Sequence, residues 1–203
     1  MKQLAEKTHR GLRGRVEAGR SGGGNAYGYD VVRKAQADGM VEMGLRAINP
    51  SEAEIVRRIY RAYAHGDGPR AIAKALNTQG VPGPSGRTWG PSTINGNASR
   101  GTGILNNELY VGKLVWNRLK YVKNPNTGKR QSRPNPPEAW VIHDVPGLRI
   151  VPQELWEAVK ARQAQMARAT RPDRKQADFW KHQRPRYLLS GLMKCGACGA
   201  NRG

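Results

Sequence analysis

Apolar residues follow a helical spacing at the start of the chain. Leu4, Thr8, Leu12 and Val16 recur at every fourth position within residues 2–19, which predicts a helix with one thin apolar stripe. A stripe this narrow buries little surface, so we expect the helix to depend on a partner helix or on DNA.

A second helix is predicted over residues 50–64, where the apolar residues again lie on one face. The start of this helix has two interpretations. Either Asn49 caps it with Pro50 in the first turn, or Ser51 caps it with Glu54 three residues later.

Two further helices follow closely in the sequence. One is predicted over residues 69–79; the next begins at Pro91 and extends to about Asn107, with a break around residues 101–103. Helix, tight turn, helix, loop and helix at this size are typical of a helix-turn-helix unit.

The second half of the chain alternates short strands with turn signals. Residues 111–118 and 140–145 are predicted to pair as strands, and the basic arm between them, residues 119–136, has a turn at 124–128. A last helix is predicted over residues 152–166. The predicted fold class is therefore α+β: mainly helical, with a helix-turn-helix-like core and a β-hairpin, preceded by a long helix and followed by a basic tail.

Charge is strongly unbalanced and segmental. Lys and Arg total 35 against 15 Asp and Glu, a formal net charge of +20. Residues 111–136 contain no acidic residue, and residues 160–186 hold nine basic residues against two acidic ones. This balance points to a polyanionic partner, duplex DNA before an anionic membrane. No apolar run approaches the ~18 residues of a membrane span and the N-terminus resembles no export signal, so we expect a cytoplasmic protein with no membrane partner.

Short polar side chains on the helix that begins at Pro91 are candidates for base recognition in a major groove. They are Ser92, Thr93, Asn95, Asn97 and Arg100, of which residues 93, 97 and 100 share a helical face. The alternative is an ordinary solvated helix face. In the basic arm, Lys120, Lys123, Lys129 and Arg130 are expected to contact phosphates.

The two cysteines, Cys195 and Cys198, form a CxxC pair near the end of the chain. Tetrahedral zinc needs four ligands, so this pair is an incomplete, weak zinc site, and the alternative is two reduced thiols. We expect no required cofactor. No phosphate-binding loop, HExxH motif or serine nucleophile motif is present, and no catalytic residue is predicted.

The order of several motifs resembles the large serine site-specific recombinases of the resolvase/invertase superfamily, found on phages and mobile elements. The final motif resembles the opening of the zinc ribbon of that family. The matching segments are 24–29 (GNAYGY), 54–60 (EIVRRIY), 72–77 (IAKALN), 80–82 (GVP), 89–94 (WGPSTI), 103–112 (GILNNELYVG) and 189–199 (LSGLMKCGACG).

This resemblance implies a bacterial or phage-encoded, nucleoid-associated protein of DNA recombination. In the family, a catalytic domain forms a phosphoserine link to DNA, and the full-length protein works as a dimer or tetramer. That domain has no counterpart here, so we expect DNA binding without catalysis. The family's long helix crosses the minor groove and its linker follows the groove, which implies DNA contacts by Arg13, Arg20, Ser21 and Asn25.

The resemblance also divides the chain into five segments. They are the end of a long linking helix (1–20), a flexible Gly-rich linker (21–30), the recombinase domain (31–167), a basic linker (168–187) and the start of a zinc ribbon (188–203).

One alternative is a basic zinc-knuckle protein that binds RNA or associates with ribosomes. RNA-binding proteins favour exposed aromatic side chains for stacking. Aromatic residues make up only 6% of this chain, and four of its tryptophans are expected in the core, which favours DNA: Trp89, Trp116, Trp140 and Trp156.

Overall fold

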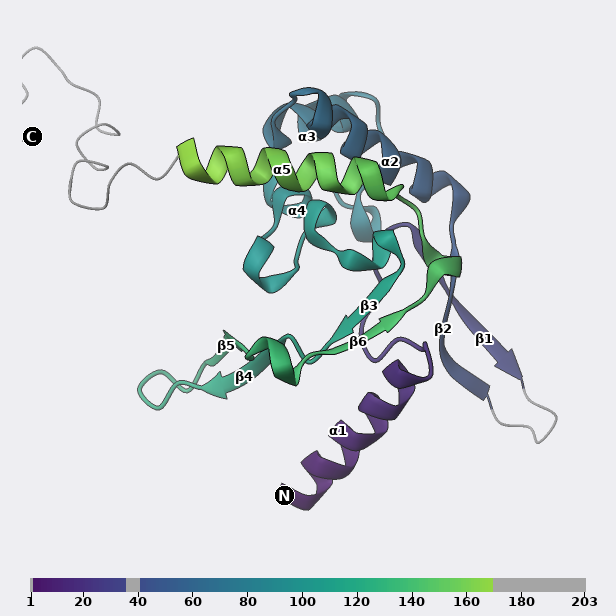
Figure 1. Ribbon diagram of the computed structural model, residues 1–203, viewed down its shortest axis with the longest axis vertical. Helices are drawn as coiled ribbons and strands as arrows, with labels where there is room; N and C mark the ends of the chain where they lie inside the picture. Colours follow the sequence, from purple (N-terminus) through teal and green to yellow (C-terminus); the bar gives the residue numbers. More distant parts are fainter. Residues whose placement is uncertain (1, 36–40, 170–203) are drawn as a thin grey trace, which may run out of the picture. The chain divides into compact units, whose positions relative to one another are not determined.

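A computed structural model describes residues 2–35 and 41–169 (Figure 1). The chain divides into two units, Met1–Arg162 and Gln163–Gly203, and the description below concerns the first. The helices are α1 (Lys2–Glu17), α2 (Pro50–His65), α3 (Pro69–Thr78), α4 (Pro91–Asn95) and α5 (Gln153–Ala169). The strands are β1 (Tyr29–Ala35), β2 (Val41–Ile48), β3 (Lys113–Trp116), β4 (Leu119–Lys123), β5 (Arg130–Pro134) and β6 (Val141–Asp144). The α+β class is confirmed.

The core lies among α2, α3, α4, α5 and the short 3₁₀ turns that precede β3. Three buried tyrosines connect these parts through their hydroxyls. Tyr60 donates to the carbonyl of Ile104 at 2.8 Å, Tyr110 donates to that of Tyr27 at 2.8 Å, and the Tyr29 hydroxyl lies 2.9 Å from the Leu109 carbonyl. Burial raises the pKa of all three phenols, so they stay protonated and serve as donors.

The ends of α2 are fixed by side chains. Asn49 is the N-cap, because its side-chain oxygen accepts from the amide of Glu52 at 3.2 Å while Pro50 occupies the first turn. Of the two predicted caps, the first is therefore correct. At the other end, the Arg162 guanidinium of α5 donates to the carbonyls of Tyr63, Gly66 and Asp67. These bonds attach α5 to the last turn of α2 and to the two residues that follow this helix.

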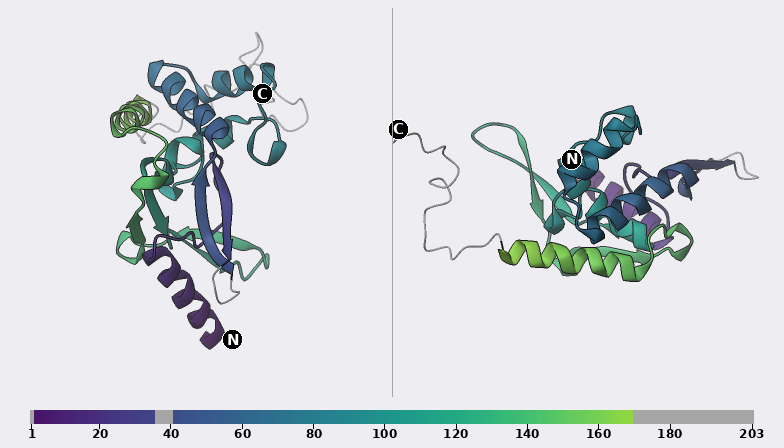
Figure 2. Two further views of the ribbon diagram at one scale, coloured as in Figure 1. Left: turned by 90° about the vertical axis from the view of Figure 1, so that its right-hand side faces the viewer. Right: turned by 90° about the horizontal axis from the view of Figure 1, so that it is seen from above.

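Three antiparallel strand pairs surround the helical core. Pairing of β3 with β6 was predicted and is confirmed, over fewer residues than expected. The basic arm is itself a hairpin of β4 and β5. Figure 2 shows that both this hairpin and the β1–β2 hairpin extend away from α2 and α3.

The β1–β2 hairpin was not predicted. Its strands lack a clean alternation of buried and exposed residues, since Val31 and Met43 are 56% and 48% exposed, and the register shifts between Val32 and Lys34. Tyr29 and Asp30, which the predicted linker included, begin β1.

The helix predicted from Pro91 to Asn107 is wrong. The α4 helix ends at Asn95, because Gly96 adopts a φ of 54°, in the left-handed region that favours glycine. A Cβ atom on Gly96 would collide with the carbonyl of Thr102, which passes close by. The chain then makes a loop over Asn97–Thr102, and residues 93, 97 and 100 do not share a helical face. This segment is called the recognition loop below, only because candidate base contacts were predicted in it from the sequence.

Asn106 holds the recognition loop to the core. Its side chain is only 3% exposed, and its amide nitrogen donates to the carbonyls of Asn95 at 2.6 Å and Thr102 at 3.0 Å. Its oxygen accepts from the Lys160 ammonium of α5 at 2.8 Å. One buried amide thus joins α4, the end of the recognition loop and α5.

Replacing Asn106 by Ala should lower the free energy of unfolding by about 1–3 kcal/mol, because it leaves two carbonyls and an ammonium short of a partner. Urea unfolding measures this change. Asn126→Ala, in the exposed turn of the arm, is the control and should change little. Equal stability of the two variants would contradict the role given to Asn106.

Lys160 should make stability depend on pH. Burial lowers the pKa of Lys160 from 10.5 to about 8, whereas the unfolded chain keeps the ordinary value. Between pH 8 and 10 the unfolded state binds more protons, so the free energy of unfolding should rise with pH. Above pH 10 the buried tyrosines oppose this rise, because they ionise first in the unfolded chain.

Urea unfolding at several pH values from 7 to 10 tests this prediction. Lys160→Met should reduce the rise, and Lys74→Met, at an exposed position of α3, should retain it. The same pH slope in the Lys160 variant as in the parent protein would show that another group is responsible.

Candidate nucleic-acid interface

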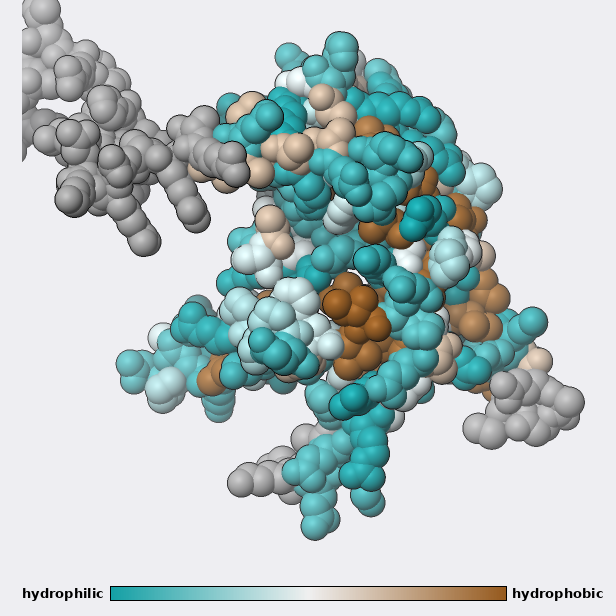
Figure 3. Space-filling view, viewed as in Figure 1, coloured by the Kyte–Doolittle hydropathy of each residue, from teal (hydrophilic) through white to brown (hydrophobic). Residues whose placement is uncertain are grey.

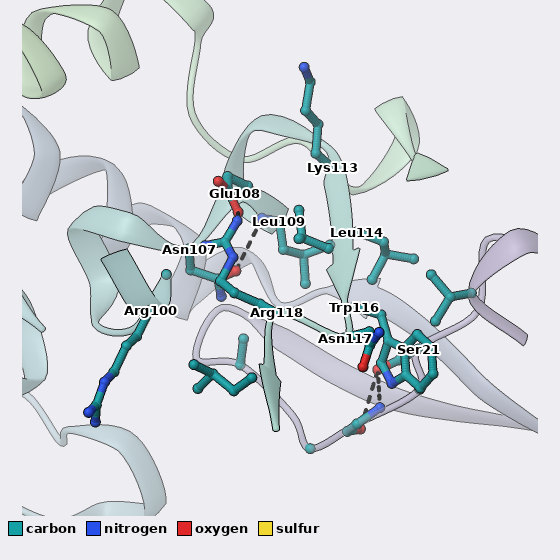
Figure 4. A pocket seen from close by; sticks show the side chains of 18 of the residues that line it. Ser21, Arg100, Asn107, Glu108, Leu109, Lys113, Leu114, Trp116, Asn117 and Arg118 are labelled. Carbon is teal, nitrogen blue, oxygen red and sulfur yellow. Dashed lines mark hydrogen bonds and ion pairs between the residues drawn. The ribbon is translucent and has the colours of Figure 1, made fainter. Parts of the chain in front are cut away.

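A hollow of about 570 Å³, called the groove below, lies between the segment Ser21–Gly24 and the residues that precede β3 (Figure 4). Its lining also includes β3 and the start of the arm, which is the hairpin of β4 and β5 with its turn. Four basic residues line the groove against one acidic residue, Glu108: they are Arg46, Arg100, Lys113 and Arg118. This balance suits an anionic ligand.

Arg46 of β2 holds the Gly-rich segment in place. One guanidinium nitrogen lies 2.6 Å from the Ser21 hydroxyl, 3.1 Å from the Gly23 carbonyl and 2.5 Å from the Gly24 carbonyl, and the other nitrogen donates to Asn25. The linker predicted as flexible is thus fastened over Ser21–Asn25. Burial lowers the pKa of Arg46, yet a guanidinium stays charged at neutral pH.

Close backbone approach completes this attachment. The amide of Ser21 donates to the carbonyl of Gly44 at 2.8 Å. Gly44 has a φ of 91°, and a Cβ atom there would come within 2.8 Å of the Ser21 carbonyl oxygen. Glycine is therefore required at position 44 for the linker to cross the β1–β2 hairpin.

Arg118 fixes the base of the arm. Its guanidinium lies 2.5 Å from the Glu108 carboxylate, stacks 4.5 Å from the Trp140 ring centre and packs against Gly101 of the recognition loop. The Arg118 charge is therefore largely balanced within the protein. Figure 4 shows Arg118 directed toward Glu108, whereas Arg100 and Lys113 extend away from them.

The recognition loop borders two hollows. Gly101 lines both the groove and a second hollow of about 380 Å³, which Asn25, Ser92 and Thr93 also line. The structure thus brings predicted contact residues of the linker and of α4 together. Arg100, in contrast, lies at the groove.

Asn97 has a local structural role that the helical interpretation missed. Its side-chain oxygen accepts from the Ser99 hydroxyl at 2.7 Å and from the amide of Arg100 at 3.2 Å. These bonds cap a 3₁₀ turn, Ala98–Arg100. The side chain of Asn95 is exposed, and its carbonyl is bound by Asn106.

The remaining predicted contact residues lie on separate elements. Arg13 pairs with Glu17 at 2.8 Å within exposed α1, and Arg20 pairs with Glu42 of β2 at 2.5 Å. Lys120, Lys123 and Arg130 are exposed on the strands of the arm, and Lys129 is exposed in its turn. Figure 3 shows a mostly hydrophilic surface over α1 and the arm.

The predicted metal ligands, Cys195 and Cys198, lie outside the described residues. Within residues 2–35 and 41–169, no three His, Cys, Asp or Glu side chains gather into a metal-binding group. Over the same ranges, no helix combines the length and apolar character that crossing a bilayer requires.

The Recombinase family model matches residues 50–166. This chain belongs to the recombinase family. The match corresponds to the recombinase domain of the large serine recombinases. It begins at the first residue of α2 and includes the recognition loop and the arm, whereas the linker and Arg46 precede it.

Two solved structures are similar in fold to this recombinase chain. A crystal structure of an LSR–DNA complex shows 20% identity and a TM-score of 0.46 over 79% of this chain. A structure from work on sequence requirements of the Listeria innocua prophage attP site shows 21% identity and a TM-score of 0.45 over 96%. The recombinase chain spans 38% and 63% of the lengths of those two proteins. No curated protein matches its sequence.

Sequence reasoning missed Arg46 and Arg118. Arg46 lies in the hairpin that periodicity did not reveal, and Arg118 was counted only as part of a basic segment. The spacing of residues carries no signal for either role, since both depend on contacts between distant parts of the recombinase chain.

Replacing Arg46 by Ala should loosen the linker between Gly22 and Gly24, because the Arg46 guanidinium contacts Ser21, Gly23, Gly24 and Asn25 while the remaining bonds hold only its two ends, at Ser21 and Asn25. Backbone ¹⁵N relaxation should show higher amplitude of motion at the amides of Gly22, Gly23 and Gly24. Arg33→Ala, which removes the same charge from an exposed position of β1, should leave these amides unchanged. Unchanged relaxation in the Arg46 variant would contradict the attachment.

Proposed function

We propose that this recombinase chain binds duplex DNA and supplies the DNA-binding part of a serine site-specific recombinase. The observation that carries the proposal is the convergence of the Gly-rich linker, the recognition loop and the basic arm on one groove. The linker offers an accessible backbone, the recognition loop offers the long cationic side chain of Arg100, and the arm offers a row of exposed cations.

In this proposal, phosphate contacts position the protein and a small number of side chains select the sequence. Some of the exposed cations of the arm serve the first purpose. Arg100 is the leading candidate for the second, because its guanidinium extends from the recognition loop and can bond guanine in two places. Asn97 is assigned to loop structure rather than to base contact, because its oxygen is already occupied.

In the recombinase family, strand exchange depends on a serine of a catalytic domain. We propose that residues 2–35 and 41–169 bind DNA and supply no nucleophile for that step. Assembly into a dimer or tetramer is proposed for the full-length enzyme only.

Binding to duplex DNA should depend strongly on salt. If about 6–10 phosphates are contacted, the affinity should fall by about 10³–10⁵ between 50 and 200 mM salt. Fluorescence anisotropy with labelled duplex measures this fall, and a duplex RNA of the same length is the competitor. Tighter binding of RNA than of DNA would favour the RNA-binding alternative. Weak binding of either nucleic acid without salt dependence would exclude both functions.

Arg100→Ala should cost about 1–3 kcal/mol on a duplex selected from a random library and should reduce the preference for that duplex over random DNA. Arg61→Ala is the matched control, since it removes one cation from α2 while Arg57 still pairs with Glu54. Equal losses on selected and random DNA would assign Arg100 to phosphate contact instead.

A further inference from the structure

The two faces of the arm are chemically similar but lie in different surroundings. In an antiparallel pair, residues directly opposite one another share a face and successive residues alternate. Lys123 therefore shares a face with its partner Arg130, and Lys120 shares the other face with Arg133. Sequence reasoning had expected Lys120 and Lys123 to act alike, yet they point in opposite directions.

Only one face borders the groove. Leu119 and Tyr121, which alternate with Lys120, both line it. Tyr121 shares its face with Ser132, and the cross-strand pair beyond them is Lys123 and Arg130. The groove-side face is thus defined by Tyr121, Ser132, Lys123 and Arg130, and the outer face by Lys120, Val122, Gln131 and Arg133.

The structure holds this orientation at the base of the arm. Asn117, between β3 and β4, has a φ of 61°, and its side chain donates to the Ala139 carbonyl at 2.8 Å. Asn135, just after β5, donates to the Asn117 carbonyl at 2.8 Å. Together with the Arg118–Glu108 pair, these bonds resist rotation of the arm about its axis.

The groove-side face has the composition of a binding surface. Tyr121 is 63% exposed, although it lines the groove, and the Arg130 guanidinium carbon lies 5.9 Å from its ring centre. Lys123 and Arg130 are like charges directly opposite each other, an arrangement that an anion between them would stabilise. Lys120 and Arg133 form the same kind of pair on the outer face, so the groove-side face is distinguished by Tyr121 and by its position beside the groove. Across the groove, Gly23 and Gly24 have open space where a Cβ atom would lie.

We propose that one sugar–phosphate backbone of the DNA lies in the groove, between the linker and the groove-side face of the arm. This inference rests on the proposed DNA binding and specifies its geometry. Lys123 and Arg130 contact phosphates, Tyr121 packs against a deoxyribose, and the open glycines let the backbone approach the linker. Lys120 and Arg133 face away from that strand.

The experiment compares single alanine variants of matched charge on the two faces, using anisotropy with one duplex across a salt series. Lys123→Ala and Arg130→Ala should each weaken binding by about five- to tenfold near 100 mM salt and reduce the salt slope by about one unit. Lys120→Ala and Arg133→Ala should each change affinity less than about twofold, because they remove the same charge on the outer face.

An uncharged pair provides a second measurement. Tyr121→Ala should weaken binding without changing the salt slope, and Val122→Ala, also exposed but on the outer face, should change neither. Circular dichroism establishes that each variant keeps the fold.

The outcomes separate the two proposals. Equal losses on both faces, larger losses on the outer face, or no loss on either face would overturn the groove assignment while leaving DNA binding intact. Failure of the parent protein to bind duplex DNA would overturn the proposed function itself.

Discussion

The side-chain amide of Asn106 is the constraint on which the arrangement of the recognition loop depends. The loop is irregular, so its backbone groups lack the partners that a helix or sheet would supply. From a buried position, Asn106 donates to the carbonyl of Thr102 in the loop and to that of Asn95 at the end of α4, and its own oxygen accepts from Lys160. A buried polar network of this kind stabilises the fold only when all of its members are hydrogen-bonded. It therefore favours the one loop conformation in which these bonds form.

Buried or half-buried side chains also fasten three other irregular parts of the described chain. Arg46 attaches the linker, Arg118 secures the base of the arm and Arg162 completes the end of α2. In each case a long cationic side chain from one element reaches the carbonyls or carboxylate of another. A chain with a formal charge of +20 thus uses some of its cations internally, and only the remainder is available to an anionic ligand.

Elements with strong local signals could be predicted from the sequence. Asn49 and Pro50 mark the start of α2, and Pro69 with Gly80 bounds α3 within two residues, because caps and helix breakers act over a few positions. The turn signal at residues 124–128 likewise located the turn between β4 and β5. These signals sufficed for the fold class and for the predicted basic arm.

Elements fixed by distant contacts could not be predicted. The end of α4 depends on the approach of Gly96 to Thr102, and the helical pattern continues through Gly96 in the sequence. The β1–β2 hairpin is exposed on much of both faces, so hydrophobic alternation gives little signal there. Contacts between distant segments also set the geometry of the candidate site. The sequence therefore suggested individual contact residues without their surroundings: Asn97 was expected to contact bases, and Arg46 was overlooked.

Amide hydrogen exchange with and without saturating duplex DNA tests the central claim most directly, because it reports on the linker, the recognition loop and the arm together. If DNA lies in the groove, adding it should slow exchange at Gly22–Gly24, at Ala98–Gly101 and along β4, high salt should reverse this effect, and the exposed face of α2 should be unaffected. Slowed exchange confined to α2 and α3, with none at the linker and the arm, would contradict it.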